Sequence, residues 1–148
     1  MKKILIKKLF SISFFVLSLV LLTGVVAGKV SAVSCNLVPN GYYSTTITFQ
    51  DNGEVETGTL WFKPNGTLVE TNTAVAGNHY GTWTSTGSNS FSLQFTETLP
   101  NGFVVKIKQT NDQFTHGTDA FSGTSVGTVY NGDTIVGQRT ATITAIHN

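Results

Sequence analysis

Residues 90–114 read SFSLQFTETLPNGFVVKIKQTNDQF, and apolar and polar residues alternate on both sides of the pair Asn101-Gly102. Alternation with a period of two is typical of a β-strand that buries one face. Asn and Gly tolerate the positive φ that both central residues of a type I′ turn need, and this turn fits a twisted hairpin best. The segment therefore predicts two antiparallel strands joined by a tight turn.

The same pattern continues through the chain from residue 41 onwards. Runs rich in Thr, Val, Ile and aromatic residues are separated by turn residues, and no run shows the 3.6-residue period of a helix. Asn-Gly pairs at 52–53, 101–102 and 131–132 predict tight hairpins. The pair at 65–66 predicts a turn without specifying its type, and the pair at 40–41 marks the start of the first strand. Eight strands are expected, at residues 41–50, 54–63, 66–73, 79–86, 90–98, 102–114, 120–130 and 134–146.

Sequential antiparallel strands with mostly short connections favour a meander, and a long meander normally closes because closure removes exposed edge strands. The expected fold class is all-β, a single eight-stranded antiparallel up-and-down barrel. A two-sheet sandwich is the alternative, although the connections here are short for one. The interior of an eight-stranded barrel is either filled by side chains or holds one small ligand. Alternation leaves the inner face ambiguous in the second and third runs, where Leu60 and Phe62 compete with Val55 and Trp61 for the interior.

The N-terminal segment has a different composition. Lysines precede a long uncharged apolar stretch, which is followed by the small residues of Val30-Ser31-Ala32. This order is typical of a secretory signal peptide, so a secreted, extracellular protein is expected. Retention of the segment as a membrane anchor and acylation of Cys35 are the alternatives. The expected organisation is a signal peptide at 1–32, a flexible leader at 33–40 and the barrel domain at 41–148.

Charge excludes some classes of partner. After residue 32 only four cations remain against the eight acids of the chain, a net charge of −4. Nucleic acids and anionic membranes are bound by clustered Lys and Arg. Neither a nucleic acid nor a membrane is therefore an expected partner once the signal peptide has been removed. The single Cys cannot form an internal disulfide.

The landmarks of the chain resemble those of the lipocalin-like (calycin) group of small barrels, in an uncharacterised secreted bacterial subgroup. Gly41-Tyr42-Tyr43 matches the Gly-x-Trp that begins the first strand of those barrels, with Tyr in place of Trp, and Arg139 lies in the last strand. Further landmarks are Phe62 with Asn65-Gly66, Gly81-Thr82-Trp83, Phe91 with Phe95, and Phe121-Ser122-Gly123. The resemblance implies a barrel with a small apolar ligand and the packing of Arg139 across the ring of Tyr43.

Aromatic residues with polar edges suit the mouth of a pocket, although they also serve as ordinary filling of a barrel. Arg139 needs a partner on its Ala and Ile face, and a ligand anion is the alternative to Tyr43. The candidate ligand-binding residues are Tyr43, Trp61, Trp83, Phe95 and Arg139.

Other motifs predict neither catalysis nor metal binding. Gly123-Thr124-Ser125-Val126-Gly127 matches a nucleophile elbow, but the elbow requires a strand-to-helix turn that this chain lacks room for. Solvated turns account for the acidic groups at two hairpins. Those groups are Asp112, His116 and Asp119, and Asp51, Glu54 and Glu56. No cofactor is expected.

The expected function is therefore the binding of a small apolar molecule in the lumen of a secreted barrel, without catalysis. A structural or surface-interaction protein with a filled core is the alternative. A pocket enzyme resembling the allene-oxide-cyclase type of barrel is a more distant one. It would need an internal acid or base, and alternation places only one carboxylate, that of Glu97, on an inner face.

Overall fold

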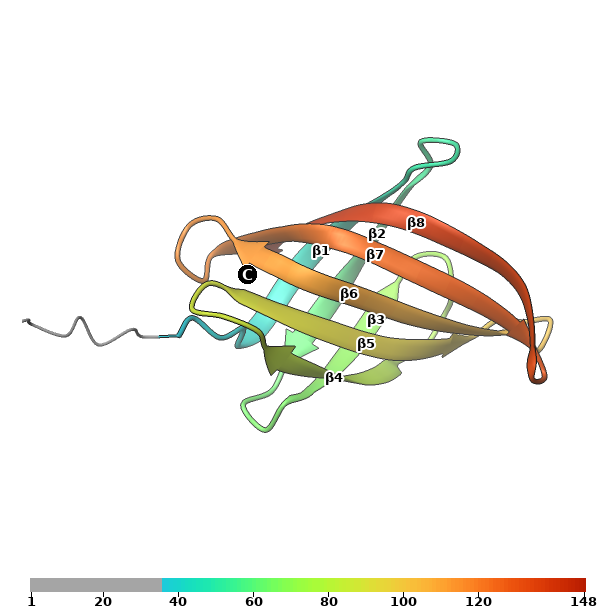
Figure 1. Ribbon diagram of the computed structural model, residues 1–148, viewed down its shortest axis with the longest axis horizontal. Coiled ribbons are helices and arrows are strands. Elements are labelled where there is room, and N and C mark those ends of the chain that lie inside the picture. The colour runs from blue at the N-terminus through green and yellow to red at the C-terminus, as the bar shows by residue number, and fades with distance from the viewer. Residues whose placement is uncertain (1–35) are drawn as a thin grey trace, which may run out of the picture. The chain divides into compact units, whose positions relative to one another are not determined.

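A computed structural model describes residues 36–148 as a closed antiparallel barrel of eight strands (Figure 1). The expected signal peptide, Cys35 and the start of the leader lie outside the described residues. Among residues 36–148 no helix has the length and apolar character needed to cross a membrane. The strands are β1 (Gly41–Phe49), β2 (Val55–Phe62), β3 (Thr67–Asn72), β4 (His79–Ser85), β5 (Ser90–Thr98), β6 (Val104–Phe114), β7 (Ala120–Asn131) and β8 (Thr134–His147).

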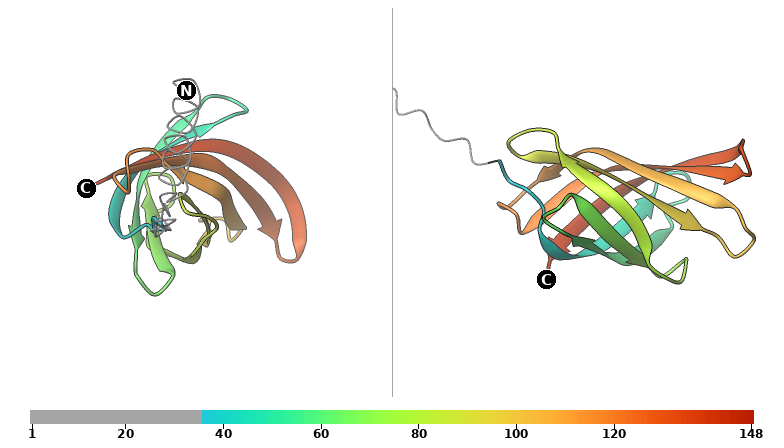
Figure 2. Two further views of the ribbon diagram at one scale, coloured as in Figure 1. Left: turned by 60° about the vertical axis from the view of Figure 1, so that its left-hand side comes forward. Right: turned by 90° about the horizontal axis from the view of Figure 1, so that it is seen from below.

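The strand order confirms the predicted meander. Each strand pairs with the next along the chain, and β1 pairs with β8 to close the barrel. The hairpins alternate between the two ends, so the β1–β2, β3–β4, β5–β6 and β7–β8 turns share one end. Figure 2 shows the β5–β6 and β7–β8 hairpins projecting at the end away from the C-terminus. We call the end with these four turns the mouth and the other end the closed end.

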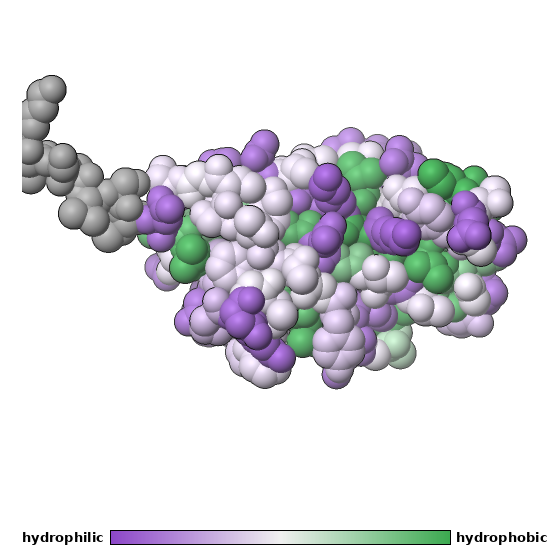
Figure 3. All heavy atoms as spheres, turned by 60° about the horizontal axis from the view of Figure 1, so that its bottom comes forward, coloured by the Kyte–Doolittle hydropathy of each residue, from purple (hydrophilic) through white to green (hydrophobic). Residues whose placement is uncertain are grey.

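The inner and outer faces follow the alternation of the sequence. Leu60 and Phe62 are buried inside the barrel, whereas Val55 and Trp61 lie on the outside. Figure 3 shows one face of the outer surface, on which apolar patches are separated by polar side chains. Isolated exposed apolar residues of this kind are normal on a protein surface.

The turns confirm the predicted positions but not the predicted type. The only non-glycine residue with positive φ in residues 36–148 is Asn111, so no Asn of an Asn-Gly pair adopts the conformation of a type I′ turn. Only the glycine has positive φ, for example 85° at Gly102. The amide of Gly102 donates to the carbonyl of Leu99, and the amide of Leu99 donates to the carbonyl of Phe103. This is a type I turn followed by a bulge glycine.

The asparagines stabilise these turns through their side chains. The Oδ1 atom of Asn101 accepts a hydrogen bond from the amide of Phe103, at 3.1 Å. Asn52 and Asn65 accept in the same way from the amides two residues further on, at 3.0 Å and 3.1 Å. Asn is therefore selected here for a local side-chain acceptor and Gly for positive φ.

Aromatic side chains fill the closed end. The ring of Phe62 packs against those of Phe91 and Phe121 with centroids 5.5 Å and 6.0 Å apart, in edge-to-face geometry. Tyr43 is fully buried beside them, and its hydroxyl donates to the carbonyl of Thr118 at 2.6 Å. Because these rings occupy the interior at the closed end, open volume for a site remains only in the mouth half of the barrel.

Candidate functional site

A cavity of about 460 Å³ occupies the mouth half of the barrel. Its wall is mostly apolar, with a few polar side chains from different strands. The turns at the mouth contribute Ala74 and Val75 from the β3–β4 connection and Leu99 and Pro100 from the β5–β6 connection. The remaining lining residues are Ile47, Phe49, Glu56, Asn72, Phe95, Glu97, Asn101, Val105, Ile107, Gln109, Ser125, Gly127, Val129, Arg139 and Ala141.

The cavity exists because inward side chains become smaller along the barrel. On β7 the inward positions change from Phe121 at the closed end to Ser125, Gly127 and Val129 towards the mouth. Ala141 of β8 lies across from Phe49. An eight-stranded barrel is just wide enough for side chains to fill, so small residues on its inner face leave open volume.

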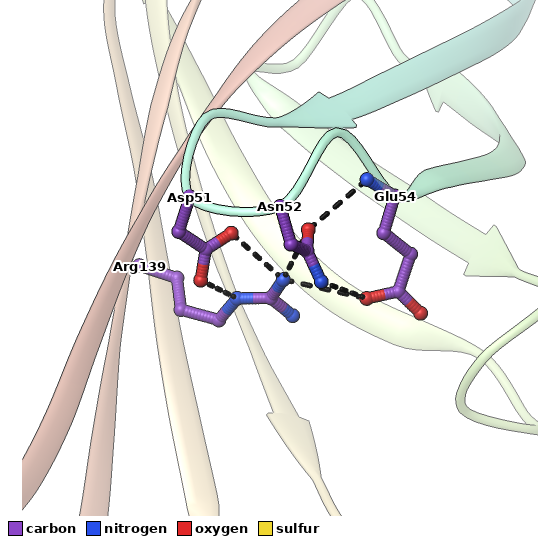
Figure 4. A network of polar contacts seen from close by, with 4 residues as sticks. All are labelled: Asp51, Asn52, Glu54 and Arg139. Atoms are coloured by element: carbon purple, nitrogen blue, oxygen red, sulfur yellow. Dashed lines mark hydrogen bonds and ion pairs between the residues drawn. The ribbon is translucent and has the colours of Figure 1, made fainter.

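Arg139 lies at the edge of this cavity and is held by the β1–β2 turn (Figure 4). Its Nε lies 3.0 Å from Oδ2 of Asp51, and its Nη2 lies 3.0 Å from Oδ1 of the same carboxylate. The same Nη2 lies 3.3 Å from Oε2 of Glu54. The guanidinium also stacks on Phe49, 3.7 Å from the ring centroid.

This arrangement corrects the expected partner of Arg139. The resemblance implied Tyr43, but Tyr43 lies at the closed end and Arg139 at the mouth. The residue of β8 that packs on Tyr43 is His147, whose ring centroid lies 4.9 Å away in edge-to-face geometry. The alternation of β8 shows which residues face inward but not how far each lies along the barrel axis. It therefore could not predict that Arg139 and Tyr43 lie at opposite ends.

Three ionisable side chains meet at the inner wall beside the cavity. Glu70 of β3, His79 of β4 and Glu97 of β5 each offer a ligand atom, and these atoms lie within 4.8 Å of one another. The side-chain nitrogen Nδ2 of Asn72 donates to Oε1 of Glu97 at 2.7 Å and to Oε2 of Glu70 at 3.3 Å. Glu97 and Asn72 also line the cavity, so this cluster forms part of its wall.

Both carboxyl groups of this cluster have a raised pKa. Burial, followed by repulsion from Glu97, raises the pKa of Glu70 to about 8. Burial also raises the pKa of Glu97, against the opposing influence of His79 and Asn72. Glu56 adds a smaller repulsion to both. The cluster is therefore a region of unfavourable negative charge in the wall.

Glu97 is therefore not the only inward carboxylate. Glu70 could have been found from the alternation of β3, because Leu68, Glu70 and Asn72 share one face. Asp112 could not, because a bulge in β6 shifts the register between Gln109 and Gln113, and Asn111 takes a positive φ of 58° there. The bulge turns Asp112 inward.

Asp112 is fully buried, and neither carboxylate oxygen has a hydrogen-bond partner within residues 36–148. Burial raises the pKa of Asp112 to about 7. Oδ1 of this side chain occupies the space that a Cβ on Gly123 would need. Glycine on β7 therefore makes room for an acidic side chain from β6.

The predicted ligand-binding residues divide between several places. Phe95 and Arg139 line the cavity. Tyr43 is in the core at the closed end, and Trp83 is half-buried there, packed on Phe62 with its Nε1 donating to the carbonyl of Lys63 at 3.0 Å. Trp61 stacks on Tyr42 outside the barrel, with ring centroids 5.1 Å apart. Apart from Glu97 and Arg139, the polar residues of the cavity wall were missed because they come from strands where one inward polar residue looks like a break in the pattern.

The structure separates Asp112 from the two residues that neighbour it in the sequence motif, His116 and Asp119. His116 and Asp119 lie in the β6–β7 connection, where the amide of Asp119 donates to the carbonyl of His116 at 3.0 Å. Asp112 is inside the barrel instead of in that loop. Ser125, at the centre of the Gly-x-Ser-x-Gly match, lies within β7 with no helix after it, as expected.

No protein-family model matches this chain, and no curated protein matches it. Among solved structures, the chain is similar to EF1p2_mFAP2b bound to DFHBI, with a TM-score of 0.57 and 18% sequence identity. The match covers 78% of this chain and 98% of that chain. A likeness at this identity shows the barrel fold that the two proteins have in common.

Proposed function

We propose that this protein is a secreted barrel that binds one small, mostly apolar molecule in its mouth half, without transforming it. The observation that carries the proposal is the cavity of about 460 Å³. This volume is within the range of small-molecule sites, which combine apolar walls with a few convergent polar groups. A wholly filled core, which the structural alternative requires, is at odds with this open volume.

The wall favours a ligand with an apolar body and a hydrogen-bond-donating or cationic group. Ile47, Phe95 and Ile107 supply apolar contacts. Two acceptors of the wall support this choice: Glu97 lines the cavity, and Gln109, another lining residue, has a buried Oε1 with no partner within residues 36–148. An anionic ligand would have to displace Asp51 from Arg139.

The solved structure of EF1p2_mFAP2b contains DFHBI, a small molecule, in a protein with the same kind of barrel. This supports the choice of a small-molecule ligand over a macromolecular partner. We also propose membership of the lipocalin-like (calycin) barrels, supported by the eight-stranded meander and by Tyr43 near the start of β1. The packing of His147 on Tyr43, where the resemblance implies Arg139, is a difference from that pattern.

Native mass spectrometry of protein purified from its secreting cells, followed by solvent extraction, tests the proposal. We expect one bound small molecule per chain, which denaturation releases. The proposal would be contradicted if the protein had the mass of the chain alone and if a panel of small apolar compounds did not change its thermal stability. A compound that is consumed during incubation would instead support the enzyme alternative.

A further inference from the structure

We propose that Glu70, His79 and Glu97 form a binding site for a divalent transition-metal ion, with Zn²⁺ as its best-fitting probe. The proposal does not depend on the proposed cavity ligand. It rests on the placement of three ligand side chains, two carboxylates and one imidazole, in one row of the sheet, on an unpartnered buried oxygen, and on the tautomer of the imidazole.

The three residues are neighbours across adjacent strands. Glu70 of β3 lies directly opposite His79 of β4 in the antiparallel register. Extending the β4–β5 register by two residues from the pair Gly81–Phe95 places His79 opposite Glu97. Side chains opposite one another on one face of a sheet have Cβ atoms about 5 Å apart. The backbone therefore brings the three side chains together without any contribution from a flexible loop.

Glu70 has a free oxygen where an ion would bind. The residue is 2% exposed, and its Oε1 has no hydrogen-bond partner within residues 36–148. Its other oxygen, Oε2, accepts from Asn72, which also donates to Oε1 of Glu97. Asn72 thus holds one oxygen of each carboxylate and leaves the other to a further partner. A buried carboxylate oxygen without a partner is costly, and a bound cation removes that cost.

The tautomer of His79 suits a metal ligand. Its Nε2 lies 3.2 Å from the carbonyl oxygen of Val75, which can only accept, so Nε2 carries the proton. The lone pair is then on Nδ1. Metal-binding histidines typically donate their second ring N–H to a carbonyl or carboxylate, which fixes the tautomer. The Val75 backbone is itself held by Asn72, whose Oδ1 accepts from the amides of Ala74 and Val75 at 2.9 Å and 2.7 Å.

The ligand set selects the class of ion. One imidazole and two carboxylates suit zinc and related first-row ions, whereas Ca²⁺ and Mg²⁺ prefer oxygen ligands alone. Zinc bonds are about 2.0–2.2 Å long, so zinc binding requires the three ligand atoms to lie closer together than the 4.8 Å within which they are found, and the two Glu side chains to adjust accordingly. Three protein ligands leave a fourth tetrahedral position open. Because Glu97 lines the cavity, that position would be reachable from it.

Isothermal titration of tag-free protein with Zn²⁺ alone tests the proposal. We expect one ion per chain, and about 100-fold or greater loss of affinity in each of the variants His79→Gln, Glu70→Gln and Glu97→Gln. The matched controls are His116→Gln and Asp133→Asn, at exposed positions in turns, which should bind as the unaltered protein does. Circular dichroism shows whether each variant is folded.

Two further readouts distinguish a specific site from incidental binding. Bound Co²⁺ should give visible absorption bands that change in His79→Gln and not in His116→Gln, and a millimolar excess of Ca²⁺ should not displace the ion. Absence of stoichiometric Zn²⁺ binding would overturn the proposal. Binding that survives His79→Gln and both Glu variants, or binding that is lost in His116→Gln, would overturn it equally.

Discussion

Arg139 binds both carboxylate oxygens of Asp51, with its Nε 3.0 Å from Oδ2 and its Nη2 3.0 Å from Oδ1 (Figure 4). The contact joins β8 to the β1–β2 turn, residues far apart in the sequence, at the edge of the cavity. Arg139 lowers the pKa of Asp51 through this hydrogen bonding, so the pair stays ionised at neutral pH. The pairing positions one side of the mouth.

Substitution Arg139→Lys should loosen this turn more than it destabilises the fold. Lys cannot reproduce the two parallel hydrogen bonds or the stacking on Phe49. Both charged groups are solvent-accessible, so the midpoint of thermal unfolding should change little. Hydrogen exchange should become several-fold faster at the amides of Phe49 and Gly53, which close the turn by donating to the carbonyls of Glu54 and Phe49. Unchanged exchange there would contradict a positioning role for Arg139.

Asp112→Asn should stabilise the protein at neutral pH. The pKa of Asp112 is raised by burial from 3.8 to about 7. Between these values the folded state binds more protons than the unfolded state, so the free energy of unfolding falls as pH rises. This loss of unfolding free energy reaches its full size above pH 7 and is absent below pH 4. At one pKa unit per 1.36 kcal/mol, it is at most about 4 kcal/mol.

Urea unfolding of both proteins between pH 4 and pH 8 measures this effect. The difference in unfolding free energy between Asp112→Asn and the unaltered protein should grow with pH and level off above pH 7. Asp133→Asn, in the exposed β7–β8 turn, should show no such trend. A difference that is the same at every pH would show that Asp112 does not titrate in this range.

Gly123→Ala should destabilise the barrel by about 1–3 kcal/mol, because the new Cβ would occupy the place of the Asp112 carboxylate. The cost should largely disappear in an Asp112→Ala background, where the carboxylate is absent. Chemical denaturation of the two single variants and the double variant gives the coupling energy. Additive effects would mean that the two side chains do not compete for one space.

Gly102→Ala tests the corrected turn type. Gly102 has a φ of 85° and open space around its Cβ position, so the cost is conformational alone, about 1–2 kcal/mol. Gly137 also has open space but no positive φ, which makes Gly137→Ala a matched control. That variant should be neutral or more stable by up to about 1 kcal/mol. Equal effects of the two substitutions on the unfolding free energy would contradict this account of the turn.

The sequence predicted the barrel well because most strands have a regular period of two and most turns contain Gly or Asn as a local signal. The strands lie within a few residues of the expected ranges, and β1 meets β8 as closure requires. The type of turn was predicted wrongly because an Asn-Gly pair suits two conformations. In the turn that forms, Asn101 acts through its side chain without adopting positive φ, and only Gly102 takes the left-handed conformation.

The candidate site was less predictable because it depends on depth along the barrel. Tyr43 and Arg139 both point inward, but one is at the closed end and the other at the mouth. Alternation tells which face a residue occupies, not which layer. The inward position of Asp112 depends on a bulge at Asn111, and no simple sequence pattern predicts this bulge.

The most direct test of ligand binding in the cavity is a fluorescence titration with Nile red, a neutral apolar dye. Gly127 lines the cavity and has room for a Cβ, so Gly127→Trp should fill it. Thr128 is adjacent in β7 and lies on the outer face, which makes Thr128→Trp the control. The account predicts saturable binding at one site, weakened about tenfold or more in Gly127→Trp, since the Trp takes up the volume that the dye needs, and unchanged in Thr128→Trp. Equal affinity in both variants, or no saturable binding by the unaltered protein, would contradict it.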